Sequence, residues 1–397
     1  MKTAGIIAEY NPFHNGHRYL IERLREQGAT HIVAVMSGHL VQRGEVASFS
    51  KWARAEAALK NGVDLIVELP SLYATLSAER FAQAAVFLLD RMGCVDILGF
   101  GSESGEVNPF LRAAEACVSP KADALIRIKL AQGVSYAMAR QAAVEQYAGQ
   151  EVADVLSQPN DILAVEYCKA LQKLGSAIIP VTFERTGVGH DSNVSHDRIA
   201  SASLLREKVL AGESFQQFVP DSGWKVYTSE LQKGSAPCRM DQLGTALLFQ
   251  LRKLSQEDFS LLPDVSEGLE CRLFQSARAA CSLKEFYSLA KTKRYAHSRL
   301  RRIALYAALG ITKKDLLISP PYLRILGMNA RGVEIAARMK QTASLPYGTS
   351  FAKLSQATGS DGKRVAALEI QAGNLFGLGI PVPLPGGIDF TKQAVIF

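Results

Sequence analysis

Two histidines near the N-terminus have the residue type and the spacing of a phosphate site. His14 and His17 flank Asn-Gly directly after an apolar run and an Asn-Pro pair. The run Ala4 to Ala8 predicts a strand, the Pro-containing segment a turn, and Gly16 to Gln27 a helix. The first N–H groups of a helix are unpaired, and the helix dipole favours an anion there. Imidazoles at such a junction can neutralise charge on a phosphorus in nucleotidyl transfer, and the intervening glycine leaves room for a phosphate.

Two other interpretations of this pair stay open. Histidines at i and i+3 can also ligate a metal, or they can be ordinary polar residues that cap a helix. We favour the nucleotide site because the pair follows the first predicted strand, and because a motif is supported by its structural context. We expect no dedicated metal site.

Composition indicates an ordinary globular protein of the cytoplasm. Of its 397 residues, 48% are hydrophobic and 21% are charged. No apolar run is long enough to span a membrane, and Met1-Lys2-Thr3 leads into the first strand without a signal sequence. The 6 cysteines form no C-x-x-C pair, which favours reduced thiols. The net charge of +7 is compatible with a polyanionic partner.

The first half alternates between apolar strand patterns and helical patterns. Such alternation predicts an α/β fold with a doubly wound, Rossmann-like parallel sheet of the nucleotidyltransferase type. Ligands of such sheets bind beyond the carboxyl ends of the strands, so the loops after the strands should share one rim. The predicted strands are Ala4 to Ala8, His31 to Met36, Asp64 to Pro70, Val95 to Gly101 and Ala177 to Arg185.

A second phosphate-site candidate follows the loop Gly187 to Asn193. Ser201 and Ser203 stand at a predicted helix start, and Arg206 comes one turn later. Hydroxyls and free N–H groups at a helix N-terminus, together with an arginine, suit a triphosphate. The same pattern is also a common N-cap signature.

The second half reads as long helical patterns with little strand signal. We therefore expect a catalytic ATP-binding domain over residues 1–206 and a mainly helical domain over residues 207–397. The most basic segment of the second domain contains Lys291, Lys293, Arg294, Arg299, Arg301 and Arg302.

No acidic residue occurs from Phe286 to Thr312. At 100° per residue four of these cations, Lys291, Arg294, Arg301 and Arg302, fall on one helix face. Tyr295 and His297 lie among them and could stack on unpaired RNA bases. The alternative is a solvated helix face, the usual fate of a charge run.

Three longer strings carry a resemblance to a known family. They are Glu9 to His17, Gly38 to Glu45 and Gly62 to Pro70. With these the chain resembles the bacterial tRNA(Met) cytidine acetate ligase family over nearly its whole length. The resemblance implies an enzyme that uses ATP to activate acetate as acetyl-adenylate, and transfers the acetyl group to N4 of the wobble cytidine of elongator tRNA(Met), giving N4-acetylcytidine. Mg²⁺ is expected with the ATP.

The resemblance also implies the residues of the site. His14 and His17 would act on the α-phosphate and its bridging oxygen, and Lys293-Arg294 match the segment expected to hold tRNA. His39-Leu40 and Val46 to Phe49 depart from the family's usual pattern. The family's ATP site corresponds to Ile7, Ala8, Glu9, Tyr10, Asn11, Pro12, Phe13, His14, Asn15, Gly16, His17, Arg18, Tyr19, Leu20, Gly101, Asn160 and Arg185.

Two other functions compete with this one. A small-molecule adenylyltransferase would explain the histidine pair but not the basic segment. A non-catalytic RNA-binding factor on a nucleotidyltransferase fold would explain the basic segment but not an intact histidine pair. The sequence offers no nucleophilic Cys or Ser arrangement, so direct transfer of the acetyl group from the adenylate to the cytidine is the simpler mechanism. The sequence names no general base for this transfer and no protein partner.

Overall fold

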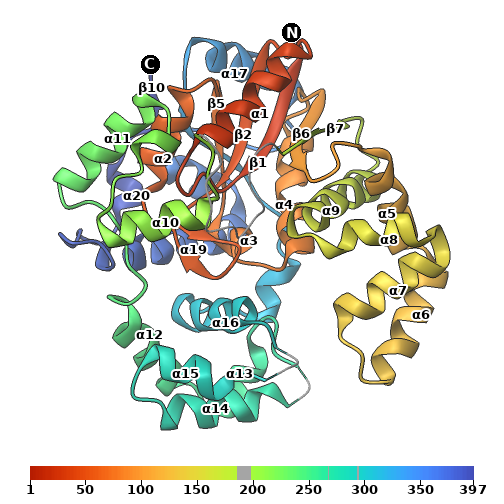
Figure 1. The fold of residues 1–397 in the computed structure, drawn as a ribbon. Helices are drawn as coiled ribbons and strands as arrows, with labels where there is room; N and C mark the ends of the chain where they lie inside the picture. The colour runs from red at the N-terminus through yellow and green to blue at the C-terminus, as the bar shows by residue number, and fades with distance from the viewer. Residues whose placement is uncertain (186–197, 267, 293–294) are drawn as a thin grey trace.

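The computed structural model describes residues 1–185, 198–266, 268–292 and 295–397, and its centre is one mixed sheet (Figure 1). The strand order is β10-β8-β5-β2-β1-β6-β7, with β9 paired to β8. The pairs β1–β2, β1–β6, β2–β5 and β6–β7 are parallel, as the alternating pattern predicted. The strands from the first half are β1 (Thr3–Ala8), β2 (His31–Ser37), β5 (Leu65–Leu69), β6 (Ile97–Ser102) and β7 (Ile179–Glu184).

Helices cover both faces of this sheet because its inner strands are apolar on both sides. Every residue of β2 is buried, and its side chains alternate between two hydrophobic clusters. One cluster includes residues of α1 (Asn15–Glu26), α2 (Lys51–Leu59), α10 (Ala202–Ala211) and α11 (Asp221–Gln232). The other includes residues of α3 (Ser71–Ala74), α4 (Ala78–Arg91), α5 (Asn108–Val118), α9 (Pro159–Leu174), α17 (Ala330–Thr342) and α19 (Gly359–Leu378). The doubly wound fold is thereby confirmed.

The second half is mainly helical, but the expectation that it carries little strand was wrong at the sheet edge. β8 (Leu323–Met328) pairs antiparallel with β5, and β10 (Val395–Ile396) and β9 (Tyr347–Gly348) pair with β8. A short apolar run cannot be assigned to strand or helix by its periodicity, which is why this strand escaped prediction. The sheet therefore does not end with residue 206.

The remaining helices form two lobes beside the sheet (Figure 1). The first lobe contains α6 (Pro120–Ala131), α7 (Tyr136–Ala148) and α8 (Gln150–Asp154). The second contains α12 (Gly244–Lys253), α13 (Gln256–Leu261), α14 (Leu269–Ala279), α15 (Leu283–Ala290) and α16 (His297–Leu309), while α18 (Phe351–Ala357) and α20 (Ile388–Thr391) lie nearer the sheet. In the part of the chain that the structure describes, no helix is both long and apolar enough to cross a membrane.

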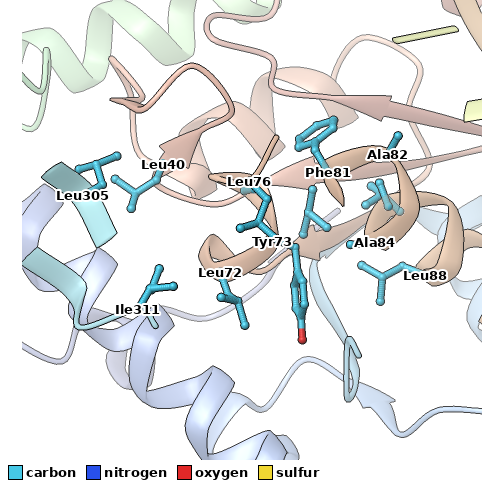
Figure 2. Packing of buried hydrophobic residues seen from close by; sticks show 14 of the residues in the cluster. Leu40, Leu72, Tyr73, Leu76, Phe81, Ala82, Ala84, Leu88, Leu305 and Ile311 are labelled. Carbon is cyan, nitrogen blue, oxygen red and sulfur yellow. The ribbon is translucent and has the colours of Figure 1, made fainter. Parts of the chain in front are cut away.

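Helix α16 is packed into the core of the first half. Figure 2 shows Leu305 of α16 beside Leu40, which belongs to the short hairpin of β3 (Leu40–Val41) and β4 (Glu45–Val46). The hydroxyl of Tyr306 donates a 2.6 Å hydrogen bond to the carbonyl of Thr75, just after α3. These buried contacts fix the position of α16 relative to the hairpin.

A buried charge network also joins the two halves. Lys51 Nζ donates to Glu369 Oε1 at 2.7 Å and to Asp389 Oδ1 at 2.6 Å, and it bonds Glu68 as well. Arg324 Nη1 donates to Glu68 Oε2 at 3.0 Å and to Asp389 Oδ1 at 2.5 Å. All five side chains are at most 3% exposed. We call these five residues the charge network.

Candidate active site

A cavity of about 650 Å³ opens at the carboxyl ends of β1, β6 and β7. It brings together most of the predicted site: Ile7, Ala8, Glu9, Tyr10, Asn11, His14, Gly16, His17, Tyr19, Leu20, Gly101, Asn160, Arg185, Arg206 and Arg301. A smaller cavity of about 410 Å³ beside α4 and α9 contains none of the predicted residues. The candidate residues therefore meet at the rim that was predicted beyond the carboxyl ends of the parallel strands.

His14 and His17 form a stacked pair at the start of α1. Their ring centroids are 3.7 Å apart, with the planes inclined at 28°. His14 is the N-cap of α1, and its Nδ1 accepts from the backbone N–H of Gly16 at 3.1 Å. The Nδ1 of His17 accepts from the backbone N–H of His14 at 3.2 Å. Because each Nδ1 is an acceptor, the neutral form of each ring carries its proton on Nε2.

Burial favours the neutral form of both rings. Burial, and after it the positive charges of Arg185 and Arg206, lower the pKa of His14 to about 3. Burial and the neighbouring His14 hold the pKa of His17 well below its usual value. The pair therefore offers N–H donors rather than cations until an anion enters.

The glycine between the histidines serves the His14 ring. A Cβ at Gly16 would lie 3.0 Å from His14 Cε1, closer than nearly all real contacts. The sequence suggested that this glycine clears space for a phosphate. In the structure its first effect is to let the N-cap ring fold back over the helix start.

Gly101 near the end of β6, Asn160 in the first turn of α9 and Arg185 directly after β7 meet on the other side of the cavity. A Cβ at Gly101 would lie 3.1 Å from Arg185 Cγ, so the absence of a side chain at residue 101 leaves room for the side chain of Arg185. Asn160 Nδ2 donates to Glu103 Oε1 at 2.9 Å. Burial lowers the pKa of Arg185, although Glu103 and Asp161 oppose this. Sequence reasoning gave these two acidic residues no role, because their proximity depends on the crossing of β6 and α9.

Four residues of the predicted ATP segment do not line the cavity and instead hold its loop. Pro12 follows a cis peptide bond, and the backbone N–H of Phe13 donates to the hydroxyl of Tyr227 at 2.8 Å. Asn15 Nδ2 donates to the carbonyl of Arg198 at 2.8 Å. Arg18 forms an exposed ion pair with Glu22. Phe13 and Asn15 thereby anchor the loop to α11 and to the segment before α10, while Arg18 pairs at the surface.

Of the candidate triphosphate contacts, only Arg206 lines the cavity. Its Nη2 donates to Ser203 Oγ at 3.1 Å, and its Nη1 to the carbonyl of Asn11 at 3.3 Å. Ser201 is the N-cap of α10 and accepts from the N–H of Leu204 at 3.1 Å. Ser203 thus orients Arg206, and Ser201 starts the helix that carries it.

The basic segment does not form one helical face. α15 ends at Ala290 and α16 begins at His297, so Lys291 lies in the connection, where its Nζ donates to the carbonyls of Thr292 and Tyr295. Lys293 and Arg294 lie outside the described residues, as does the loop Gly187 to Asn193. The helical pattern was extended too far because nothing in the sequence, such as a proline, marks this break.

The other cations of this segment are largely satisfied within the chain. Arg302 is buried and pairs with Asp264 Oδ2 at 2.7 Å. Arg299 Nε donates to the carbonyl of Asp264 at 2.8 Å, and its guanidinium lies 4.8 Å from the ring centroid of Tyr295. Tyr295 is itself buried, so it is not free to stack on RNA. Arg301 and the exposed His297 remain at the cavity.

Comparison with known proteins places this geometry in a family. Residues 1–383 match the family model HIGH Nucleotidyl Transferase. A tRNA(Met) cytidine acetate ligase of Syntrophomonas wolfei is 37% identical, over 100% of this chain and 99% of that protein. Another, from a Thermoanaerobacter species, is 34% identical, with both chains fully covered.

Solved structures agree with these relatives. Thermotoga maritima TmcAL in its apo form has a TM-score of 0.96 to this chain at 32% identity, with full coverage of both chains. The same protein bound with alpha-thio ATP has a TM-score of 0.93, also at 32% identity and full coverage. The chain therefore belongs to the tRNA(Met) cytidine acetate ligase family.

Proposed function

We propose that this chain is an ATP-dependent ligase that acetylates N4 of the wobble cytidine in elongator tRNA(Met). The observation that carries the proposal is the single cavity in which the buried histidine pair, Arg185 and Arg206 meet residues of α16. A relative of the same fold binds an ATP analogue, and relatives over the full chain length are tRNA(Met) cytidine acetate ligases.

In the first half-reaction, an acetate oxygen attacks the α-phosphorus of ATP. The bond from that phosphorus to the bridging oxygen breaks, and pyrophosphate leaves. The Nε2–H groups of His14 and His17 donate to the α-phosphate and the bridging oxygen, where negative charge develops. Arg206, held by Ser203, neutralises the β- and γ-phosphates. Acetyl-adenylate is the product.

Mg²⁺ would enter with ATP, because this ion is usually held by substrate phosphates and one or two carboxylates. The charge network does not fit it. Its three carboxylates are the one such cluster in residues 1–185, 198–266, 268–292 and 295–397, and Lys51 Nζ already lies among them. The carboxylates that the ATP cavity offers are Glu9 and Glu184.

In the second half-reaction, N4 of the cytidine attacks the acetyl carbonyl, AMP leaves, and N4 loses a proton. The cytidine must be unpaired to reach the cavity. No cysteine lines the described part of that cavity, which favours direct transfer from the adenylate over an acyl-enzyme.

We assign tRNA binding to residues 207–397 and ATP chemistry to residues 1–206, although β8 and β10 of the second part lie in the common sheet. Arg301 is the predicted tRNA contact that reaches the cavity. Lys291, Lys293, Arg294, Arg299 and Arg302 stay predictions from sequence, and the buried pair of Arg302 with Asp264 favours a supporting role for that residue.

The test is mass spectrometry of tRNA incubated with the protein, ATP and labelled acetate. The proposal requires the label on the wobble cytidine of elongator tRNA(Met) and the release of pyrophosphate. Pyrophosphate release without labelled tRNA would instead indicate a small-molecule adenylyltransferase. Binding of tRNA with neither product would indicate a non-catalytic RNA-binding factor.

A further inference from the structure

One wall of the ATP cavity contains no residue that the proposed first half-reaction uses. It is made of Gln42 and Arg43 from the β3–β4 hairpin and of His297, Ser298 and Arg301 from α16. We propose that this wall is the site for the acceptor base. His297 stacks on an unpaired pyrimidine, Ser298 binds the base edge, and the hairpin sets their distance from the adenylate. This inference rests on the proposed function and names the residues that receive its second substrate.

The chemistry requires the base to enter this same cavity. The acetyl group is bound to the α-phosphate, and N4 must come within bonding distance of its carbonyl carbon. The histidine loop, the β6 and β7 ends, and α10 form the walls already assigned to ATP. Residues of α4 and α9 also line the cavity, and all of these except Asn160 and Tyr167 are apolar, whereas, among the described residues, the hairpin and α16 form the one further wall that offers several polar side chains.

The hairpin is fastened to the histidine loop through Gln42 in its turn and through the chain that precedes it. The backbone N–H of Gln42 donates to Glu9 Oε1 at 2.9 Å, and Gln42 Nε2 donates to the carbonyl of Leu76 at 3.3 Å. Arg54 is fully buried and donates to the carbonyls of Glu9, Ser37 and Gly38. The ends of β1 and β2 and the start of the hairpin therefore move as one unit.

The tip of the hairpin touches the backbone of α16. Gly44 has a φ of +75°, and a Cβ there would lie 2.5 Å from the backbone nitrogen of Arg302. The adjacent Glu45 pairs with Arg301. Any larger residue at 44 must push α16 away, so this glycine sets the separation between the acceptor wall and the ATP walls.

His297 and Ser298 have the freedom that a ligand contact needs. Within the residues that the structure describes, no hydrogen bond or ion pair engages either side chain, and His297 is exposed. An imidazole presents a flat face on which any base can stack, and a hydroxyl can both donate to and accept from a base edge. Together they can hold a pyrimidine without closing the cavity to ATP.

The decisive experiment compares two reactions of the full-length protein. Acetylation of elongator tRNA(Met) is measured beside pyrophosphate release from ATP and acetate, for His297→Ala, His297→Phe and Lys284→Ala. Lys284 is an exposed cation on α15 that does not line the cavity, so it controls for general charge loss. We expect His297→Ala to raise KM for tRNA about tenfold relative to its effect on pyrophosphate release, because one base–aromatic stack is lost. The phenylalanine variant should restore most of that loss.

Each other result overturns the proposal. An unchanged KM in His297→Ala removes His297 from the acceptor site, and an equal loss in His297→Phe excludes stacking. A parallel fall in pyrophosphate release would mean that this wall binds ATP. If the unaltered protein labels no cytidine, it is the proposed function that fails, and the two failures are thus distinct.

Gly44→Ala tests the positioning role of the hairpin. We expect its kcat for tRNA acetylation to fall about tenfold more than its rate of pyrophosphate release, since a near-ångström displacement of α16 misplaces the nucleophile. KM for ATP should stay within about twofold. A variant that lost both reactions equally, with an unchanged melting temperature, would contradict this role.

Discussion

The ATP cavity and the charge network are two buried polar clusters in which burial affects the charge of ionisable side chains in opposite ways. In the network, burial alone would lower the pKa of Lys51, but the carboxylates of Asp389, Glu369 and Glu68 outweigh it and the pKa is raised. In the cavity, burial lowers the pKa of His14, and the nearest charges are arginines that lower it further. The network keeps the charge of Lys51 because carboxylates surround it, although burial raises the pKa of Glu68 to about 7. In the cavity, burial favours the neutral form of the histidines.

The difference indicates which cluster awaits a ligand. A buried charge is stable only when it is paired, and the chain supplies both signs within the network. Around the histidine pair it supplies N–H donors and the guanidinium groups of Arg185 and Arg206, and the acidic side chains that act on Arg185 are Glu103 and Asp161. A polyphosphate is the group that completes this cluster.

The largest effect should follow from removing the central cation of the network. In Lys51→Met the carboxylates of Glu68, Glu369 and Asp389 share only Arg324, so we expect the free energy of unfolding to fall by about 3–5 kcal/mol, as for other broken buried ion pairs. Urea unfolding followed by circular dichroism measures this.

Lys60→Met is the matched control, because Lys60 pairs with Glu56 at the surface, at the opposite end of the same helix. Exposed i,i+4 pairs contribute about 0.3–0.5 kcal/mol, so this variant should be close to the unaltered protein. Equal losses in the two variants would refute the claim that the network is balanced by its own buried charges.

In the cavity, the corresponding substitution should damage chemistry rather than stability. We expect His17→Ala to lower pyrophosphate release about 10²- to 10³-fold, the usual cost of one donor to a developing charge. Its free energy of unfolding should change far less than that of Lys51→Met, since no buried charge is left unpaired.

His31→Ala is the control for this variant. His31 is also nearly buried, but it lies outside the cavity and faces Glu334 Oε2 at 3.1 Å. Pyrophosphate release at an unchanged rate in His17→Ala, or an equal fall in His31→Ala, would remove the histidine pair from the reaction.

Helix α16 repeats the contrast with two adjacent arginines. Arg302 is paired with Asp264 in the interior, whereas Arg301 pairs with the part-buried Glu45 and lines the cavity. Arg302→Ala should lower the free energy of unfolding by about 2 kcal/mol, since Asp264 then loses its partner.

Arg301→Ala should instead lower kcat/KM for tRNA about tenfold and reduce the dependence of tRNA binding on salt. The opposite pattern in unfolding and tRNA kinetics would reverse the two assignments.

The sequence could predict the parts of the molecule that depend on local patterns. The parallel strands, the helix that begins near His14, and the rim at the carboxyl ends of the strands all follow from short apolar runs and their loops. Arg54 and the charge network could not be predicted, because Lys51, Arg324 and Asp389 become neighbours only through the antiparallel pairing of β8 with β5. The proposed acceptor wall could not be predicted from the sequence for the same reason, since Gly44 and Arg302 meet only in the folded chain.

The smallest expected effect is the uptake of a proton by the histidine pair when ATP binds. Burial favours the neutral form of both histidines, because it lowers the pKa of His14 to about 3 and holds that of His17 well below its usual value. In the unfolded chain both rings titrate near the ordinary value of about 6.5, so the empty protein loses stability as the pH falls from about 6.5 toward 3. A bound polyphosphate raises the pKa of both rings, and ATP binding at about pH 6 should therefore carry a fraction of a proton into the site.

Calorimetry in two buffers of different ionisation enthalpy measures that proton. Since ATP itself titrates near this pH, the relevant quantity is the difference between the unaltered protein and His17→Asn. Asparagine keeps an acceptor for the backbone N–H of His14, where the ring of His17 uses Nδ1, but it cannot take up a proton. We expect less proton uptake in the variant. Equal uptake in both proteins would mean that the imidazole of His17 stays neutral beside ATP, and that the arginines alone balance the phosphates.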